Sequence, residues 1–152
     1  PTVVRLEESS HQAHIVMRVG SVMALLETAT GRVFAAFLPP NVVKAALESK
    51  LDRLGIGYSG KKSVLGTEAD AMLADIRKRG ITRAIGDPLP GVNAFAAPVF
   101  DHTGAVALSI TAMGPAGTFN TDWHSPIAKA LLDCTHDISL RLGYTSHRPS
   151  RG

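Results

Sequence analysis

Cysteine is nearly absent from this sequence, and long apolar runs are missing altogether. Cys134 is the single cysteine among 152 residues, which excludes a disulfide within the chain and a metal cluster held by several cysteines. So little cysteine fits a reducing compartment, and the N-terminus lacks the basic and then apolar pattern of a signal peptide. No apolar run approaches the roughly 20 residues of a membrane-spanning helix. We therefore expect a cytoplasmic protein with no membrane partner.

Charge and aromatic residues are also sparse. The net charge is +3, and only 5% of the residues are aromatic. Lysine and arginine gather in three short groups, at residues 61–62, 77–79 and 148–151, with no aromatic side chains between them. A nucleic-acid surface typically carries a dense basic stripe or stacking aromatic rings. The sequence therefore predicts solvated basic residues rather than a surface that contacts DNA.

What is present is the composition of an ordinary globular domain. Hydrophobic residues make up 45% of the chain and charged residues 19%, and the length suits one domain with a real core. We expect this domain to span residues 1–145 and residues 146–152 to form a disordered tail. The chain starts at Pro1 without a methionine, so we expect it to be a piece of a longer protein.

The first third of the chain predicts short strands followed by helices. Residues 3–8 and 13–19 have the character of two strands joined by a polar turn, and residues 22–26 form a further apolar run. Thr28 or Thr30 can cap a helix that the prolines at 39 and 40 must stop. A second short helix is expected over residues 41–49.

The middle and the end of the chain predict a loop, two longer helices and a short strand. Residues 51–66 form the expected loop, and Thr67 with Asp70 resembles a capping box at the start of a helix that Gly80 ends. Residues 81–85 are expected to form a strand. A terminal helix over residues 122–142 carries an apolar face, on which Cys134 is expected to be buried as a small hydrophobic residue; that face comprises Trp123, Ile127, Leu131, Cys134, Ile138 and Leu142.

The most informative stretch is residues 91–114, where two apolar runs flank a polar turn at residues 101–104. This pattern predicts an antiparallel hairpin. If Phe100 faces Ala105, then Ala96 lies opposite Ser109 and Ala94 opposite Thr111. The alternation of strands gives the hairpin one bulky apolar face, which we expect to be core, and one small face of alanine, serine and threonine. The small face is either exposed to water or the floor of a cavity.

The order of strands, helices, strands and a helix predicts an α+β sandwich. In this architecture an antiparallel sheet carries the helices on one face. If the helices cover the bulky face of the hairpin, its small face looks the other way and leaves space there.

No pattern in the sequence supports catalysis or a metal. His11 and His14 lie at a turn and are expected to be solvated. Asp101, His102 and Thr103 are adjacent at a turn, where their side chains splay apart instead of converging as a triad requires. Ser109 lacks the glycine elbow of a nucleophilic serine. We therefore expect no catalytic residue, no metal site and no cofactor.

Two motifs resemble those of a known family. Residues 18–40, RVGSVMALLETATGRVFAAFLPP, combine an arginine-x-glycine strand, a T-A-x-G-K/R helix start and a run similar to LAFLP. Residues 90–115, PGVNAFAAPVFDHTGAVALSITAMGP, form the matching hairpin, and the R-K-R-G helix end lies between them at residues 77–80. In this order the motifs resemble the effector-binding domain of IclR-type transcriptional regulators.

The resemblance implies a GAF-like sandwich that binds a small molecule and is not an enzyme. A small organic acid, either a keto or hydroxy acid or an aromatic carboxylate, is the implied effector, and it would modulate DNA binding by an N-terminal winged helix-turn-helix domain that is absent from this chain. The backbone N–H groups at a helix N-terminus suit a carboxylate. The implied effector-binding residues are Ala29, Thr30, Gly31, Asp87, Ala94, Ser109 and Thr111.

The resemblance also implies self-association as a homodimer or tetramer. Two alternatives stay open from the residues: a free-standing GAF-like enzyme, such as a redox catalyst, and a dimerisation module that binds no ligand. A single cysteine argues against the redox catalyst.

Overall fold

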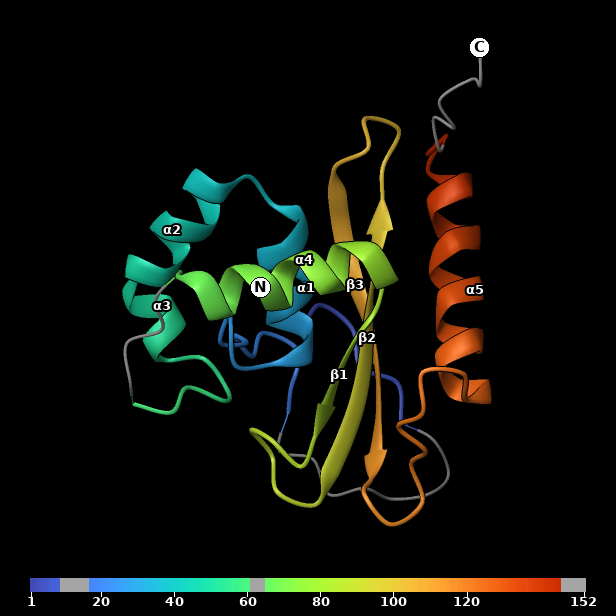
Figure 1. Cartoon of the computed structure of the whole chain (residues 1–152), viewed down its shortest axis with the longest axis horizontal. Helices are drawn as coiled ribbons and strands as arrows, with labels where there is room; N and C mark the ends of the chain where they lie inside the picture. The colour runs from blue at the N-terminus through green and yellow to red at the C-terminus, as the bar shows by residue number, and fades with distance from the viewer. Residues whose placement is uncertain (9–16, 61–64, 146–152) are drawn as a thin grey trace.

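The structure is a computed structural model in which residues 1–8, 17–60 and 65–145 are described. The segments expected as a disordered tail and as the turn with His11 and His14, and most of the expected strand at residues 13–19, lie outside these ranges. The described residues form five helices and three strands, which are labelled in Figure 1. They are α1 (Ala29–Phe37), α2 (Pro40–Glu48), α3 (Lys50–Arg53), α4 (Thr67–Arg79), β1 (Thr82–Ile85), β2 (Val92–Phe100), β3 (Val106–Pro115) and α5 (Pro126–Arg141).

The three strands form one antiparallel sheet in the order β1-β2-β3. The predicted strand at residues 81–85 and the predicted hairpin are both confirmed, and with the helices they give the α+β class that the sequence indicates. The central strand β2 is buried over most of its length, with residues 93–99 all buried. This strand therefore forms the middle of the fold, and the site is built around it.

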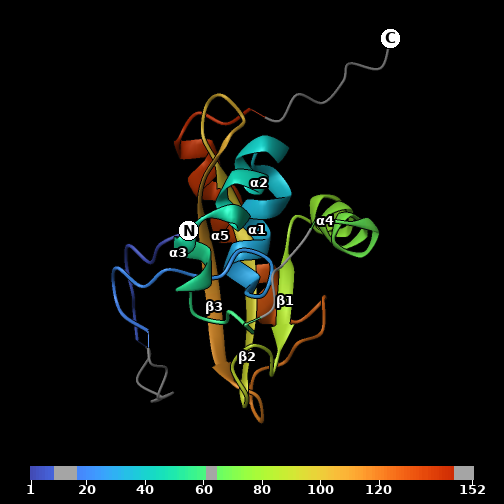
Figure 2. The ribbon, with the colours of Figure 1, turned by 90° about the vertical axis from the view of Figure 1, so that its left-hand side faces the viewer.

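Helices cover both faces of the sheet, so the expectation that they lie on one face was wrong (Figures 1 and 2). α5 packs on the bulky face, where Leu131 meets Phe95 in a buried cluster. α1 packs on the small face, where Val33 meets Ala94 and Ala96. Alanine side chains on this face are small, so a helix can pack close to the strands. The close packing of protein interiors then leaves little empty space between them. The small face is thus neither a solvent surface nor a wide cavity.

A further apolar cluster joins α2 and α4 to α1. It lies among α1, α2 and α4 and has no strand residue in it. The buried members are Leu25, Leu26, Ala35, Ala36, Val43, Leu47, Leu73 and Ile76. α1 is therefore sandwiched between this cluster and the sheet, which fixes the position of its N-terminus.

The hairpin register differs from the predicted one by two residues. The loop at residues 101–105 is closed by a hydrogen bond from the Asp101 N–H to the Ala105 carbonyl. Phe100 consequently pairs with Val106. A bulge next to Phe100 shifts the register once more. A shift of two residues keeps every side chain on its predicted face, because the alternation has a period of two.

The new partners follow from this shift. Ala96 lies opposite Thr111, Ala94 opposite Met113, and Ser109 opposite Pro98. The predicted pairings of Ala96 with Ser109 and of Ala94 with Thr111 are therefore wrong, although the predicted faces are right.

The expected N-terminal strand at residues 3–8 is not formed. Thr2 and Val22 make an isolated antiparallel bridge, and Val3 exchanges hydrogen bonds with Gly20 and Ser21. Beyond Val3, residues 4–8 are exposed. An apolar run gains stability as a strand only against a partner and a covered face, which these residues lack within the described part of the chain.

The helix boundaries confirm the sequence signals at α1 and α2 and correct three others. α5 begins at Pro126 with Ser125 as its N-cap, so residues 122–125, which were expected to be helical, lie before the helix. Thr28 is the N-cap of α1, and its hydroxyl accepts a hydrogen bond from the Gly31 N–H at 2.9 Å. At α4 the N-cap is Gly66, with no side-chain cap, so Thr67 is the first helical residue rather than a capping residue. The expected loop at residues 51–66 begins inside α3, which Ser49 caps.

Cys134 is exposed, so its predicted burial was wrong. The buried face of α5 consists of Ala128, Leu131, Thr135 and Ser139. Small side chains bring this helix close to the sheet, where the Ser139 hydroxyl accepts a hydrogen bond from the Phe100 N–H at 3.0 Å. The contact face is therefore set by small residues rather than by the most apolar stripe. None of the helices in the described ranges combines the length and the apolarity that crossing a bilayer requires.

Candidate ligand site at the N-terminus of α1

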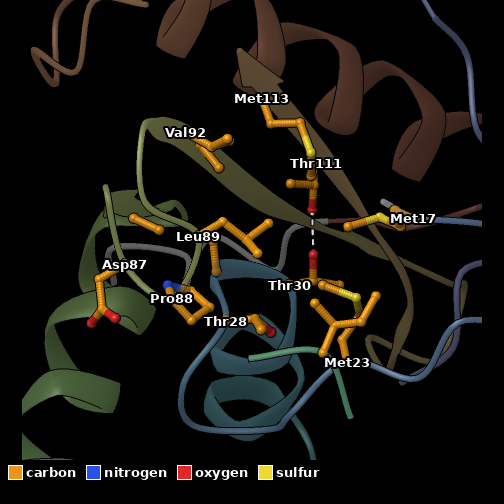
Figure 3. A pocket seen from close by; sticks show the side chains of 14 residues that line it. Met17, Met23, Thr28, Thr30, Asp87, Pro88, Leu89, Val92, Thr111 and Met113 are labelled. Carbon is orange, nitrogen blue, oxygen red and sulfur yellow. Dashed lines mark hydrogen bonds between the residues drawn. The ribbon is translucent and has the colours of Figure 1, made fainter. Parts of the chain in front are cut away.

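A cavity of about 30 Å³ lies where the N-terminus of α1 meets the small face of the hairpin. Figure 3 shows its lining, which comes from α1, all three strands, the loop before β2, and segments near residues 17, 23 and 56. This volume has room for about one or two water molecules. The lining residues are Met17, Met23, Thr28, Ala29, Thr30, Ile56, Ala84, Asp87, Pro88, Leu89, Val92, Ala94, Thr111 and Met113.

The first turn of α1 carries two backbone donors on residues that line this cavity. The Gly31 N–H is used by the Thr28 hydroxyl, which in turn donates to the Ala24 carbonyl at 2.8 Å. The N–H groups of Ala29 and Thr30 have no acceptor in the described ranges. Unpaired N–H groups at a helix start carry partial positive charge and suit an anion.

The hydroxyls of Thr30 and Thr111 meet across the cavity at 2.7 Å (Figure 3). The two residues are 81 positions apart in the sequence. The observed register brings them together, because it aligns Thr111 with Ala96 in the middle of β2. This pair is the polar centre of an otherwise apolar space, and either hydroxyl can act as donor or acceptor.

The structure brings five of the seven implied effector-binding residues to this cavity. They are Ala29, Thr30, Asp87, Ala94 and Thr111. Gly31 does not line it. An ideal Cβ at this position would stand 2.5 Å from the Leu25 carbonyl oxygen, and closer still to that of Ala24. Gly31 is therefore a packing residue, where α1 lies against the preceding turn.

Ser109 also lies away from the cavity. It is on the same face of β3 as Thr111 but two residues nearer the hairpin turn. Its buried hydroxyl has no hydrogen-bond partner among the described residues. A buried hydroxyl without a partner is unfavourable, and the structure gives no reason for its presence.

Two charged groups stand beside the cavity without filling it. The Asp87 side chain is exposed, and its carboxylate points away from the Thr30–Thr111 pair (Figure 3). Arg32 donates to the Leu26 carbonyl at 2.9 Å and to the Arg83 carbonyl at 3.5 Å. Burial lowers the pKa of the Arg32 guanidinium, while the negative charges of Asp87 and Glu27 act in the opposite direction. Arg32 therefore hydrogen-bonds to backbone carbonyls, and it is not among the lining residues.

Two segments that are far apart in the sequence form one wall of the cavity, which is called its roof below. Pro88 and Leu89 come from the loop before β2, and Ile56 comes from the segment after α3. They touch through Gly57, where an ideal Cβ would stand 2.7 Å from the Pro88 ring. The Ser59 N–H and hydroxyl both donate to the Glu27 carboxylate at 2.8 Å, which ties the second segment down.

Most of the missed lining residues had no signal in the sequence. Met113 is the exception, because it follows Thr111 by two positions and therefore shares its face. Met17, Met23 and Ile56 come to the cavity through tertiary contacts between distant segments. One of these contacts is the isolated bridge between Met23 and Ile56.

Comparisons with known proteins agree on one family. The family model described as "Bacterial transcriptional regulator IclR C-terminal" matches residues 2–140. The HTH-type transcriptional regulator TtgV of Pseudomonas putida is 26% identical over 140 residues, covering 92% of this chain and 51% of that protein. The chain spans about half the length of the curated relatives it matches.

Solved structures agree with this assignment. The crystal structure of Pseudomonas aeruginosa HmgR is similar with a TM-score of 0.80 and 39% identity, covering 95% of this chain and 56% of that chain. The C-terminal domain of the Escherichia coli transcriptional regulator KdgR is similar with a TM-score of 0.64 and 27% identity, covering 83% and 75%. The curated relatives are named as transcriptional regulators, not as enzymes. The resemblance read from the sequence motifs is thereby confirmed, and the chain belongs to the IclR family of bacterial transcriptional regulators, of which it carries the C-terminal domain.

Proposed function

We propose that this domain senses a small organic acid, and that binding of the acid alters DNA binding by a part of the regulator outside this chain. The proposal is supported by the position of Ala29 and Thr30, whose helix N–H groups are unpaired, beside a hydroxyl pair in the lining of one cavity. The carboxylate would accept hydrogen bonds from the N–H groups of Ala29 and Thr30. A second polar group of the acid would meet the hydroxyls of Thr30 and Thr111.

The small volume of the cavity suggests how binding is coupled to regulation. An acid with several heavy atoms needs more than about 30 Å³, so the roof has to move when it binds. The roof segments around Pro88 and Gly57 touch each other and would move together. A ligand shifts a protein between two arrangements only by its difference in affinity for them. The open-roof arrangement is the one that the acid would favour.

The small cavity also favours one competing function. A domain that only joins copies of the regulator needs no ligand, and a nearly filled cavity suits it. A redox enzyme has less support, because Cys134 is exposed on α5 and does not line the cavity.

Calorimetric titration of an acid and its primary amide tests the proposal. A thermal-shift screen first selects the acid, since a ligand at 100 times its dissociation constant adds about 2.7 kcal/mol of stability. Hydrogen bonds to a charged group contribute about 1.5–3 kcal/mol and neutral ones about 0.5–1.5 kcal/mol. With two N–H donors we expect the acid to bind at least about tenfold more tightly than the amide. Equal affinities would contradict the anion site, and no binding by any acid would favour the ligand-free module.

Two matched variants locate the binding site. Thr111→Val keeps the shape and removes one hydroxyl, so it should weaken the acid by about 0.5–1.5 kcal/mol. Ser109→Ala, on the same face of the same strand, should leave the affinity unchanged because Ser109 does not line the cavity. An equal loss for both variants would indicate a site elsewhere on β3.

We also propose that the domain self-associates. The apolar run at residues 22–26 is largely buried within the chain and offers little surface for association. α2 and the α3 segment instead expose Val42, Leu51 and Leu54, the last of these at 77%. Exposed apolar side chains of this kind mark association surfaces when they gather into a patch. Light scattering at micromolar concentration should give a dimer or tetramer, and a strict monomer would contradict the proposal.

A further inference from the structure

Met23 belongs to the cavity through its side chain and to the N-terminal residues through its backbone. The side chain is 4% exposed and lies beside Thr30 in the cavity wall (Figure 3). The backbone N–H of Met23 donates to the Pro1 carbonyl at 2.9 Å. A single residue therefore joins the wall of the cavity to Pro1.

Residues 1–3, called the strap below, are attached along one edge of residues 20–23. Besides the bond to Pro1, the Val3 N–H donates to the Ser21 carbonyl at 2.8 Å, and the Gly20 N–H donates to the Val3 carbonyl at 2.7 Å. The residues that follow the strap, up to residue 8, are exposed. Backbone hydrogen bonds of this kind, near the surface and close to a terminus, open more readily than those of a core strand.

The opposite edge of the same segment is bonded to Ile56, a second residue of the cavity lining. The Ile56 N–H donates to the Val22 carbonyl at 2.7 Å, and the Ile56 carbonyl accepts from the Ala24 N–H at 3.0 Å. An extended segment can form hydrogen bonds along both of its edges. Residues 20–24 are therefore the middle of a narrow ribbon, with the strap on one side and a wall of the cavity on the other.

The side of this ribbon that faces away from the strap is held firmly. An ideal Cβ on Gly55 would stand 2.6 Å from the Ala24 nitrogen, so the two backbones are already in close contact. The buried Asp52 carboxylate accepts from the Leu25 N–H at 2.8 Å. Close-packed segments shift between discrete arrangements instead of deforming gradually. A displacement of Met23 therefore has to be taken up at the more weakly held edge, which is the strap.

We infer that the strap is released when the cavity enlarges: an occupant displaces Met23, and the hydrogen bonds that hold residues 1–3 open. This inference rests on the proposed function and adds the route by which the sensor would act. The family resemblance implies a DNA-binding part N-terminal to this domain, so the strap would be the stretch that connects the two parts. The small cavity keeps the strap attached, and an acid that widens the cavity would loosen it.

Hydrogen exchange tests this inference without a ligand, because a larger side chain can stand in for an occupant. Ala94→Leu places such a side chain in the lining of a cavity of about 30 Å³. We expect the N–H groups of Val3 and Gly20 to exchange about tenfold faster than in the parent, since opening of the strap relieves the overpacking. The Asp101 N–H, which closes the hairpin loop, should exchange at its parental rate.

Ala128→Leu is the matched control. Ala128 is fully buried on α5, against the other face of the sheet, so the same change there should leave the exchange of Val3 and Gly20 unaltered. If both variants accelerate the strap equally, or neither does, the inference is wrong. Ala94→Val is a smaller insertion with the same expected direction, and it takes the place of Ala94→Leu if that variant does not fold.

Urea denaturation of a chain that lacks residues 1–3 gives the reciprocal test. If the strap resists enlargement of the cavity, removing it makes the larger side chain easier to accommodate, because coupling acts in both directions. Ala94→Leu should lower the denaturation midpoint at most about half as much in the shortened chain as in the intact chain. Ala128→Leu should lower it equally in both. An equal effect of Ala94→Leu in the two chains would overturn the inference.

These measurements use no acid, so their outcome is separate from that of the proposed function. Negative results for the strap, together with an acid that binds in calorimetry, would leave an acid sensor that acts by another route. Positive results for the strap, with no acid binding, would support the coupling between the cavity and the N-terminal residues and count against the acid sensor.

Discussion

Replacing Gly31 with alanine should destabilise the domain by about 3 kcal/mol. The new Cβ would stand 2.5 Å from the Leu25 carbonyl oxygen and still closer to that of Ala24. Both are backbone atoms, and the turn that carries them cannot retreat easily, because Thr28 and Arg32 bond its carbonyls. Alanine is the better helix former by about 1 kcal/mol, which offsets only part of the clash.

Urea denaturation followed by circular dichroism measures this loss. Gly117→Ala is the matched control, because an ideal Cβ there meets nothing within 4 Å. It should change stability by less than about 0.5 kcal/mol. A Gly31→Ala variant within about 1 kcal/mol of the parent would show that α1 can move away from the preceding turn, and the N–H groups of the proposed anion site would then not be rigidly placed.

Gly57→Ala should cost about 2–5 kcal/mol and weaken acid binding. Gly57 has φ +90, where a side chain is strained, and its Cβ would stand 2.7 Å from both the Pro88 ring and the Thr28 methyl group. The left-handed conformation costs about 1–2 kcal/mol for a residue with a Cβ. Overpacking adds about 1–3 kcal/mol. Pro88 would have to shift, and with it the roof of the cavity.

Gly60→Ala separates these two contributions. Gly60 has φ +81, but no atom of the described residues lies within 4 Å of an ideal Cβ, so the variant should lose only the conformational part, about 1–2 kcal/mol, and keep its affinity for the acid. Denaturation and calorimetry of both variants give the comparison. If the two variants lose equal stability and bind the acid equally well, the contact between the roof segments is unimportant.

Local signals were enough to predict α1 and the faces of the hairpin. Thr28 caps α1 because a threonine hydroxyl can reach the N–H three residues on, and the prolines at 39 and 40 end that helix. The alternation of strands correctly predicted that Ala94 and Thr111 share one face. The predicted register was wrong by two residues, and a shift of two leaves every side chain on the same face. The family was also visible in the order of its motifs, and the family match over residues 2–140 confirms it.

The composition of the site was only partly predictable. Ala29, Thr30, Asp87, Ala94 and Thr111 reach the cavity, as the resemblance implied. Gly31 and Ser109 do not, because a shared face or helix turn does not fix which atoms meet a space of about 30 Å³. On β3, for example, Thr111 lines the cavity, whereas Ser109, two residues away on the same face, does not.

The sequence by itself determined the class of fold, the main helices and strands, and the family. Only the tertiary structure decided that α1 and α5 cover opposite faces of the sheet, that Cys134 is exposed, and that three methionines surround one hydroxyl pair. The reason is physical. Caps, breakers and alternation act over a few neighbouring residues, so a sequence displays them directly. Packing joins segments such as those of Thr30 and Thr111, 81 residues apart, and which apolar face meets which is settled by the fit of side chains that no local pattern encodes.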